Sequence, residues 1–184
     1  MSRRSTKIVV LVLLALAIFV NACASAAPPP LLGSGAAPNF VLTSSAFAEG
    51  AAIPKKYSCD GENVSPQLKW SGAPTNTKSF AFIMDDPDAP GGTFTHWVAF
   101  DIPATQTEIA EGAKSVGKGG KNGRGQTGYT GPCPPSDTHR YFFTLYALDL
   151  ETLGLSDGAP RIDVETAMKL HSIAITGLMG RYSR

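Results

Sequence analysis

The chain has 184 residues, 43% of them hydrophobic and 17% charged, and its formal net charge is +1. This balance excludes a chain that is disordered throughout because of high charge and low hydrophobicity. The chain contains 19 glycines and 14 prolines, more than average usage gives, so we expect many turns and not an all-helical bundle.

The N-terminus has the pattern of an export signal. Arg3, Arg4 and Lys7 precede an uninterrupted apolar run of 13 residues, 8–20, which is too short to cross a bilayer comfortably. A basic head, a short apolar centre and small residues after it are typical of a secretory signal. We therefore predict that residues 1–22 are a signal peptide absent from the mature protein.

The end of this segment resembles a bacterial lipobox, with Val-Asn-Ala-Cys at residues 20–23. In such a motif the cysteine, here Cys23, becomes the lipidated first residue of the mature protein. This predicts an exported lipoprotein, held through its lipid on the periplasmic or cell-surface side of a bacterial membrane. The alternative is ordinary cleavage near Ala22 or Ala27, with Cys23 unmodified.

An uncharged segment rich in alanine and proline, residues 23–38, follows and is predicted to be a flexible tether. Residues 39–184 are enough for one folded domain. Loss of residues 1–22 would leave 13 basic against 15 acidic residues, a net charge of −2. Such a chain has no general basic surface for nucleic acid, so we expect no nucleic-acid partner.

Cysteine usage fits an exported protein. With Cys23 assigned to lipid, Cys59 and Cys133 remain, and an even pair in an exported protein is a candidate disulfide. Two separate free thiols are the alternative. No cysteine or histidine spacing matches a zinc site, and we expect neither a metal nor a cofactor.

Short apolar or alternating segments between turn signals predict a mostly-β domain with one or two peripheral helices. The segment 140–148 is the longest and is apolar on both faces, so we expect it inside a sheet. Asp163 is expected to cap a helix that begins at Val164. The other predicted strands are residues 40–43, 68–70, 79–84, 96–102 and 172–176.

A glycine-rich stretch, residues 117–128, is interpreted as a mobile surface loop. Lys118, Lys121 and Arg124 within it are expected to be solvated. Residues 123–128 match the spacing of a dinucleotide-binding glycine motif, but neither the strand before it nor the βαβ unit that the motif needs is predicted.

Two polar segments remain. Residues 85–90, Asp-Asp-Pro-Asp-Ala-Pro, follow a predicted strand, and His96 opens the next one; each feature alone would indicate a simple turn. The second is a proline-rich loop that leads into His139, Arg140 and Tyr141. Alternation along a strand places His139 and Tyr141 on one face and Arg140 on the other.

These segments resemble the two signature regions of the phosphatidylethanolamine-binding protein (PEBP) family, in its bacterial YbhB/YbcL, or Raf kinase inhibitor-like, branch. The first signature is matched by residues 86–90 with His96-Trp97 downstream, and the second by residues 139–141. The resemblance spans about residues 40–184, so residues 39–184 are predicted to be a PEBP-like domain. Further matching pieces are residues 59–61, 65–66, 68–70, 131–135 and 180–182.

The chain departs from this family at one point. Where the family usually has a glycine between the proline pair and the second signature, this chain has Ser-Asp-Thr at residues 136–138. We expect a reshaped loop, whose added carboxylate would weaken anion affinity or select against highly charged ligands.

The resemblance implies a large central antiparallel sheet, a smaller second sheet and a few peripheral helices. It also implies a non-enzymatic binding protein whose small pocket accepts phosphate or a phospholipid headgroup, and homodimers occur in parts of the family. Carried over by position, the pocket residues are Asp86, Asp88, His96, His139 and Tyr141, with Cys133, Pro134 and Pro135 at the rim.

The chemistry of these residue types suits an anion. A carboxylate beside a histidine fixes the ring tautomer and favours the protonated form. Two such histidines and a tyrosyl hydroxyl would supply directed donors. The carboxylates could also accept hydrogen bonds from an ammonium group, so a zwitterion such as phosphoethanolamine would fit.

Two other functions remain open at this point. One is an inhibitor or interaction module for a protease, a kinase or a host protein, as the family name suggests. The other is a hydrolase that uses the histidines and aspartates for acid–base chemistry. No recognisable motif places a serine or cysteine nucleophile there.

Overall fold

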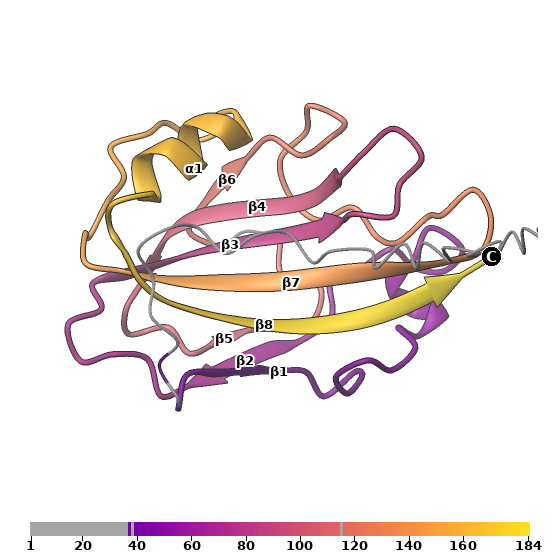
Figure 1. Cartoon of the computed structure of the whole chain (residues 1–184), viewed down its shortest axis with the longest axis horizontal. Helices are drawn as coiled ribbons and strands as arrows, with labels where there is room; N and C mark the ends of the chain where they lie inside the picture. The colour runs from indigo at the N-terminus through magenta and orange to yellow at the C-terminus, as the bar shows by residue number, and fades with distance from the viewer. Residues whose placement is uncertain (1–36, 38, 115) are drawn as a thin grey trace, which may run out of the picture.

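The computed structural model describes residues 37, 39–114 and 116–184 (Figure 1). This part of the chain is mostly β, with two antiparallel sheets and one α-helix, which confirms the predicted fold class. The predicted signal peptide, Cys23 and all of the predicted tether but Ala37 lie outside the described residues.

The larger sheet has five strands in the order β6-β4-β3-β7-β8. Its interior strand β3 is buried along all eight residues, because both faces of the sheet are covered. The longest predicted strand, now β7, also lies inside this sheet, between β3 and β8. The bounds are β3 Ser79–Asp86, β4 Phe94–Pro103, β6 Lys118–Gly120, β7 Thr138–Leu148 and β8 Ser172–Ser183.

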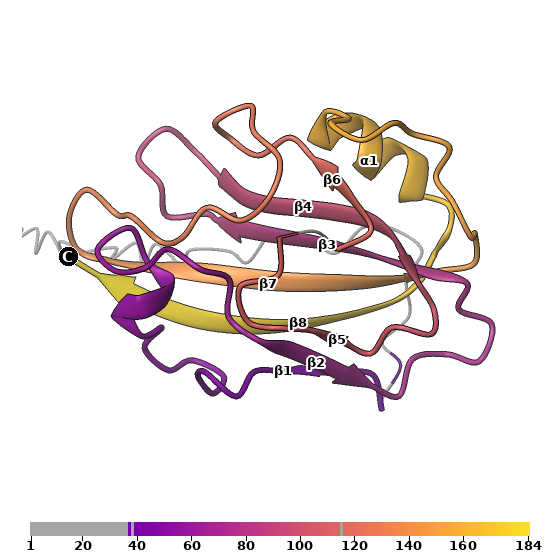
Figure 2. The same ribbon diagram turned by 180° about the vertical axis from the view of Figure 1, so that it is seen from behind.

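The smaller sheet has three strands in the order β1-β2-β5, with bounds β1 Val41–Thr43, β2 Leu68–Ser71 and β5 Glu108–Ile109. In both views it lies beside β8, and the helix α1, Arg161–Met168, lies near β4 and β6 (Figures 1 and 2). A single 3-10 turn, η1, spans Lys55–Tyr57.

Each face of the five-stranded sheet has its own core. The larger core is aromatic, with Phe82 packed edge-on against Trp97 at 5.1 Å and Trp70 against Phe80 at 5.4 Å between ring centroids. The smaller core lies beneath α1, where the buried Val164 and Met168 pack against side chains of β3 and β4. These two cores cover the two faces of the sheet that carries the polar signature residues.

The glycine-rich stretch was predicted as a loop throughout, which is wrong for its first part. Residues 118–120 form β6 and pair with β4. Gly120 allows this close pairing, because a Cβ at this position would lie 2.5 Å from a methyl carbon of Val98. Lys118 is not simply solvated, since its Nζ lies 3.0 Å from a carboxylate oxygen of Asp101.

The predicted start of the helix is also wrong. The helix α1 begins at Arg161, after Pro160, so that Asp163 lies in its first turn rather than at its cap. Arg161, the first residue of the helix, forms an ion pair with Glu165 one turn later, at 2.9 Å. It forms a second ion pair with Asp85 of β3, at 2.7 Å. No helix among the described residues is long and apolar enough to cross a membrane.

Candidate functional site

Antiparallel pairing gathers the polar signature residues at one end of the larger sheet. Asp86 is the last residue of β3 and pairs with Phe94 at the start of β4, while the start of β7 runs alongside the end of β3. A cavity of about 190 Å³, called here the anion pocket, lies at this end. Its wall consists of Asp86, Ala89, Pro90, Phe94, His96, Arg124, Cys133, Pro134, Pro135 and His139.

Asp86 and His139 form the innermost polar pair of the anion pocket. Their side chains are only 5% and 8% exposed, and His139 Nδ1 donates to Asp86 Oδ2 at 2.7 Å. The other carboxylate oxygen accepts the backbone N–H of Asp88 at 2.9 Å. Because Nδ1 is engaged, the ring of His139 leaves Nε2 for the cavity.

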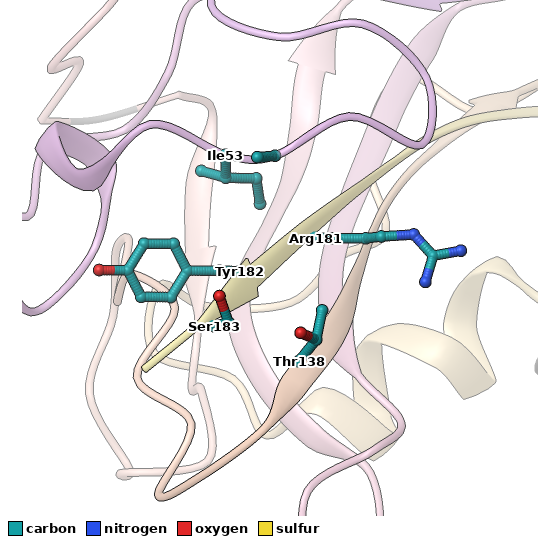
Figure 3. Close-up of a pocket in the computed structure, with 6 residues that line it drawn as sticks. Ile53, Thr138, Arg181, Tyr182 and Ser183 are labelled. Atoms are coloured by element: carbon teal, nitrogen blue, oxygen red, sulfur yellow. The ribbon is translucent and has the colours of Figure 1, made fainter.

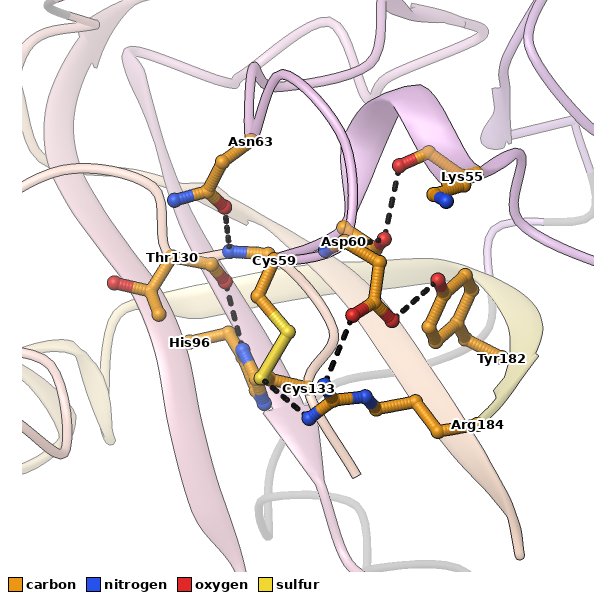
Figure 4. The surroundings of a disulfide bond; sticks show 11 residues. Lys55, Cys59, Asp60, Asn63, His96, Thr130, Cys133, Tyr182 and Arg184 are labelled. Carbon is orange, nitrogen blue, oxygen red and sulfur yellow. Dashed lines mark hydrogen bonds and ion pairs between the residues drawn. A yellow bond between two sulfur atoms is a disulfide. The ribbon is translucent and has the colours of Figure 1, made fainter. Parts of the chain in front are cut away.

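His96 has a different partner from the one expected. Its Nδ1 donates to the backbone carbonyl of Thr130 at 2.7 Å, and not to a carboxylate (Figure 4). Burial lowers the pKa of His96, which outweighs the opposing effect of the Thr130 carbonyl. With Nδ1 engaged by this carbonyl, Nε2 is the ring nitrogen that the carbonyl does not hold.

Tyr141 lies behind the wall of the anion pocket rather than on it. Its ring packs edge-on against His96, with centroids 5.2 Å apart, and its side chain is fully buried. Its hydroxyl lies close to the Asp86 carboxylate and to the backbone of Cys133, both of which act on it as hydrogen-bonding groups. Burial raises the pKa of Tyr141, and the negative charge of Asp86 raises it further.

Asp88 does not line the anion pocket either. Its carboxylate receives the guanidinium of Arg140, with contacts at 2.9 Å and 2.7 Å, and also the Arg140 backbone N–H. The hydrogen bonds from Arg140 hold the pKa of Asp88 at about 2. Strand alternation was predicted to place Arg140 on the opposite face of the strand from His139 and Tyr141. Arg140 does lie there, and it forms an ion pair with Asp88 outside the wall of the anion pocket. Asp137, the carboxylate expected to weaken anion binding, is also absent from the wall.

The rim of the anion pocket is tied to the preceding part of the chain. The structure contains the Cys59–Cys133 disulfide, next to a hydrogen bond from the Cys59 backbone N–H to the Pro132 carbonyl at 3.0 Å (Figure 4). Gly131 donates its N–H to Asn63 Oδ1 at 2.8 Å. A Cβ on Gly131 would lie 2.3 Å from a backbone oxygen, so only glycine allows this approach.

The C-terminal residues support the same rim. Asp60 accepts the hydroxyl of Tyr182 at 2.8 Å and pairs with Arg184 at 3.1 Å, and the Arg184 guanidinium also lies 3.7 Å from Cys133 Sγ (Figure 4). These contacts explain why the matching pieces around Asp60 and Tyr182, far apart in sequence, belong to one site.

Arg124 is a wall residue that the sequence did not point to. It was assigned to a solvated loop, and its side chain is exposed, but it lies on the wall of the anion pocket. The sequence did not predict this position, because a glycine-rich loop has no strand or helix periodicity that indicates where a side chain points.

A second cavity, of about 330 Å³, lies beside the end of β8 (Figure 3). Arg181 and Tyr182 leave the strand in opposite directions there, as alternation requires. The described wall of this cavity carries no histidine and no carboxylate, so it lacks the paired groups of the anion pocket. It is lined by Ala52, Ile53, Thr138, Arg181, Tyr182 and Ser183.

Comparison with known proteins agrees with the signatures. The family model described as phosphatidylethanolamine-binding protein matches residues 43–183. A protein of Aquifex aeolicus, described as a UPF0098 protein, is 49% identical over 148 residues, covering 77% of this chain and 86% of the relative. A UPF0098 protein of Methanothermobacter thermautotrophicus is 48% identical over 149 residues, covering 78% and 98%.

Solved structures show the same fold. The PEBP homologue CT736 from Chlamydia trachomatis superposes with a TM-score of 0.76 at 41% identity, covering 79% of this chain and 97% of that chain. YbcL from E. coli, described as a member of the mammalian PEBP family, has a TM-score of 0.74 at 31% identity, covering 79% and 99%. The chain therefore belongs to the phosphatidylethanolamine-binding protein family.

Proposed function

We propose that this protein is a non-enzymatic binding protein whose anion pocket holds a small phosphate-type group, either a free anion or a phospholipid headgroup. The observation that carries this proposal is the pair of histidines on one small cavity wall, each held through Nδ1 by a fixed acceptor. In both rings the nitrogen left for a ligand is Nε2.

The arrangement offers polar groups to an anion from one side of the cavity. His139 is held at Nδ1 by Asp86, which leaves Nε2 as the ring nitrogen that can interact with the anion. The buried Tyr141 lies behind this pair, with its ring packed against His96.

The described wall lacks a hydroxyl or thiol nucleophile for hydrolysis through a covalent intermediate. The wall holds no serine, threonine or free thiol, because its cysteine, Cys133, is in the disulfide. The cavity is also small, at about 190 Å³. It would hold a phosphate with a short substituent, while acyl chains would stay outside.

Calorimetric titration with phosphate and with phosphoethanolamine tests the binding proposal. The wild type is expected to bind at least one of them, and His139→Ala to lose at least about tenfold in affinity, since one charge-assisted hydrogen bond is removed. His139→Gln, which keeps a polar side chain, guards against misfolding of the alanine variant. His171→Ala is the matched control, because His171 pairs with Asp149 outside the pocket. Equal affinity of the wild type and both His139 variants for these ligands would contradict the proposal.

We also propose that the protein is exported and anchored through a lipid on Cys23. The support is the basic, apolar and lipobox sequence of residues 3–23. Metabolic labelling with palmitate in a bacterial host should mark the wild type and not Cys23→Ala. Label on both proteins, or on neither, would refute the anchor.

A further inference from the structure

The charges on the wall of the anion pocket are unevenly paired. Asp86 is paired with His139, and Arg140 is engaged by Asp88 outside the wall. Arg124 is the one charged wall residue for which the described part of the chain offers no partner of opposite charge. A ligand in this pocket therefore meets one guanidinium that is not already neutralised.

The backbone of Arg124 is held by a buried asparagine. Asn122 is 6% exposed, and its Oδ1 accepts the backbone N–H groups of Arg124, at 2.9 Å, and of Gln126, at 3.1 Å. Its Nδ2 donates to Thr130 Oγ1 at 3.1 Å. Since the carbonyl of Thr130 holds His96, the turn with Arg124 and the inner histidine are fixed to the same residue.

The field of Arg124 reaches the inner part of the pocket. Burial is the main cause of the lowered pKa of His96, and the positive charge of Arg124 lowers it further. At equal separation, a cation attracts a dianion about twice as strongly as a monoanion, and it repels an ammonium group.

We propose that Arg124 determines the ligand class of the anion pocket, and that this class is the phosphomonoester dianion. Phosphodiesters, which carry one charge, and phosphates with a nearby ammonium group are bound less well. The inference rests on the proposed anion binding and adds its selectivity. The same chemistry is offered by a soluble phosphomonoester and by a lipid whose headgroup ends in phosphate.

The test is a titration with methyl phosphate, dimethyl phosphate and phosphoethanolamine against the wild type, Arg124→Ala and Lys121→Ala. Lys121 is the matched control, because it is an exposed cation of the same turn that does not line the pocket. The wild type and Lys121→Ala should prefer methyl phosphate by about tenfold over the other two, and Arg124→Ala should lose most of that preference. Arg124→Lys should keep part of it, because the charge remains.

The outcomes separate this inference from the proposal on which it rests. If the wild type binds all three ligands equally, or if Arg124→Ala keeps the preference, the selectivity is overturned while anion binding stands. If the wild type binds none, both are overturned. Sedimentation with phosphatidylcholine vesicles, with and without phosphatidic acid, separates the two sources. Capture by phosphatidic acid that Arg124→Ala weakens identifies a lipid, and methyl phosphate binding without capture identifies a soluble phosphomonoester.

Discussion

Replacing Asp86 by alanine is expected to lower the free energy of unfolding by about 3 kcal/mol. The change leaves two donors without an acceptor, the partly buried backbone N–H of Asp88 and the buried Nδ1–H of His139, and a buried loss of this kind costs about 1–3 kcal/mol. Anion binding should fall as well, because the ring of His139 loses the group that orients it. Urea unfolding and phosphate titration of the same preparation measure both effects.

The chain contains a matched control for this change. Asp149 and His171 form a pair of the same kind at 2.9 Å, but their side chains are 42% and 39% exposed. Asp149→Ala should therefore cost less than about 1 kcal/mol and leave phosphate affinity unchanged. Equal losses of stability in the two variants would mean that burial of the Asp86–His139 pair does not matter.

Removing the disulfide is expected to have the largest effect on stability. Cys59 and Cys133 are 74 residues apart, and a cross-link of that span contributes about 4 kcal/mol by restricting the unfolded chain. The double variant Cys59→Ser/Cys133→Ser should lose about that much. Its phosphate affinity should change by less than about threefold, since the hydrogen bond from Gly131 to Asn63 still holds the rim.

A reductant provides the control for the disulfide. It should lower the stability of the wild type to that of the double variant and leave the double variant unchanged. A double variant as stable as the wild type, or one that folds normally but no longer binds phosphate, would contradict a purely structural role for this bond.

The sequence predicted the framework of the site well because local rules determine it. Strand alternation placed His139 and Tyr141 on one face of β7 and Arg140 on the other, as the structure has them. The resemblance of the signature segments to one family led to the correct fold. Antiparallel pairing then brings the end of β3 next to the starts of β4 and β7.

The side-chain partners could not be predicted in the same way. Two aspartates in one turn look equivalent in the sequence, but Asp86 ends a buried strand, whereas Asp88 lies beyond it and engages Arg140. His96 was expected beside a carboxylate and instead bonds a backbone carbonyl from a loop 34 residues later. The backbone N–H of Arg124 donates a hydrogen bond to a buried asparagine, and such a contact leaves no periodic pattern in the sequence.

Nitrogen NMR of the imidazole rings during a phosphate titration tests anion binding most directly, because the chain has three histidines and only two line the pocket. The Nε2 signals of His96 and His139 should shift together and saturate at one ligand concentration, while the signals of His171 should stay in place. Unmoved signals from His96 and His139, or an equal shift of His171, would contradict a phosphate site between the two buried histidines.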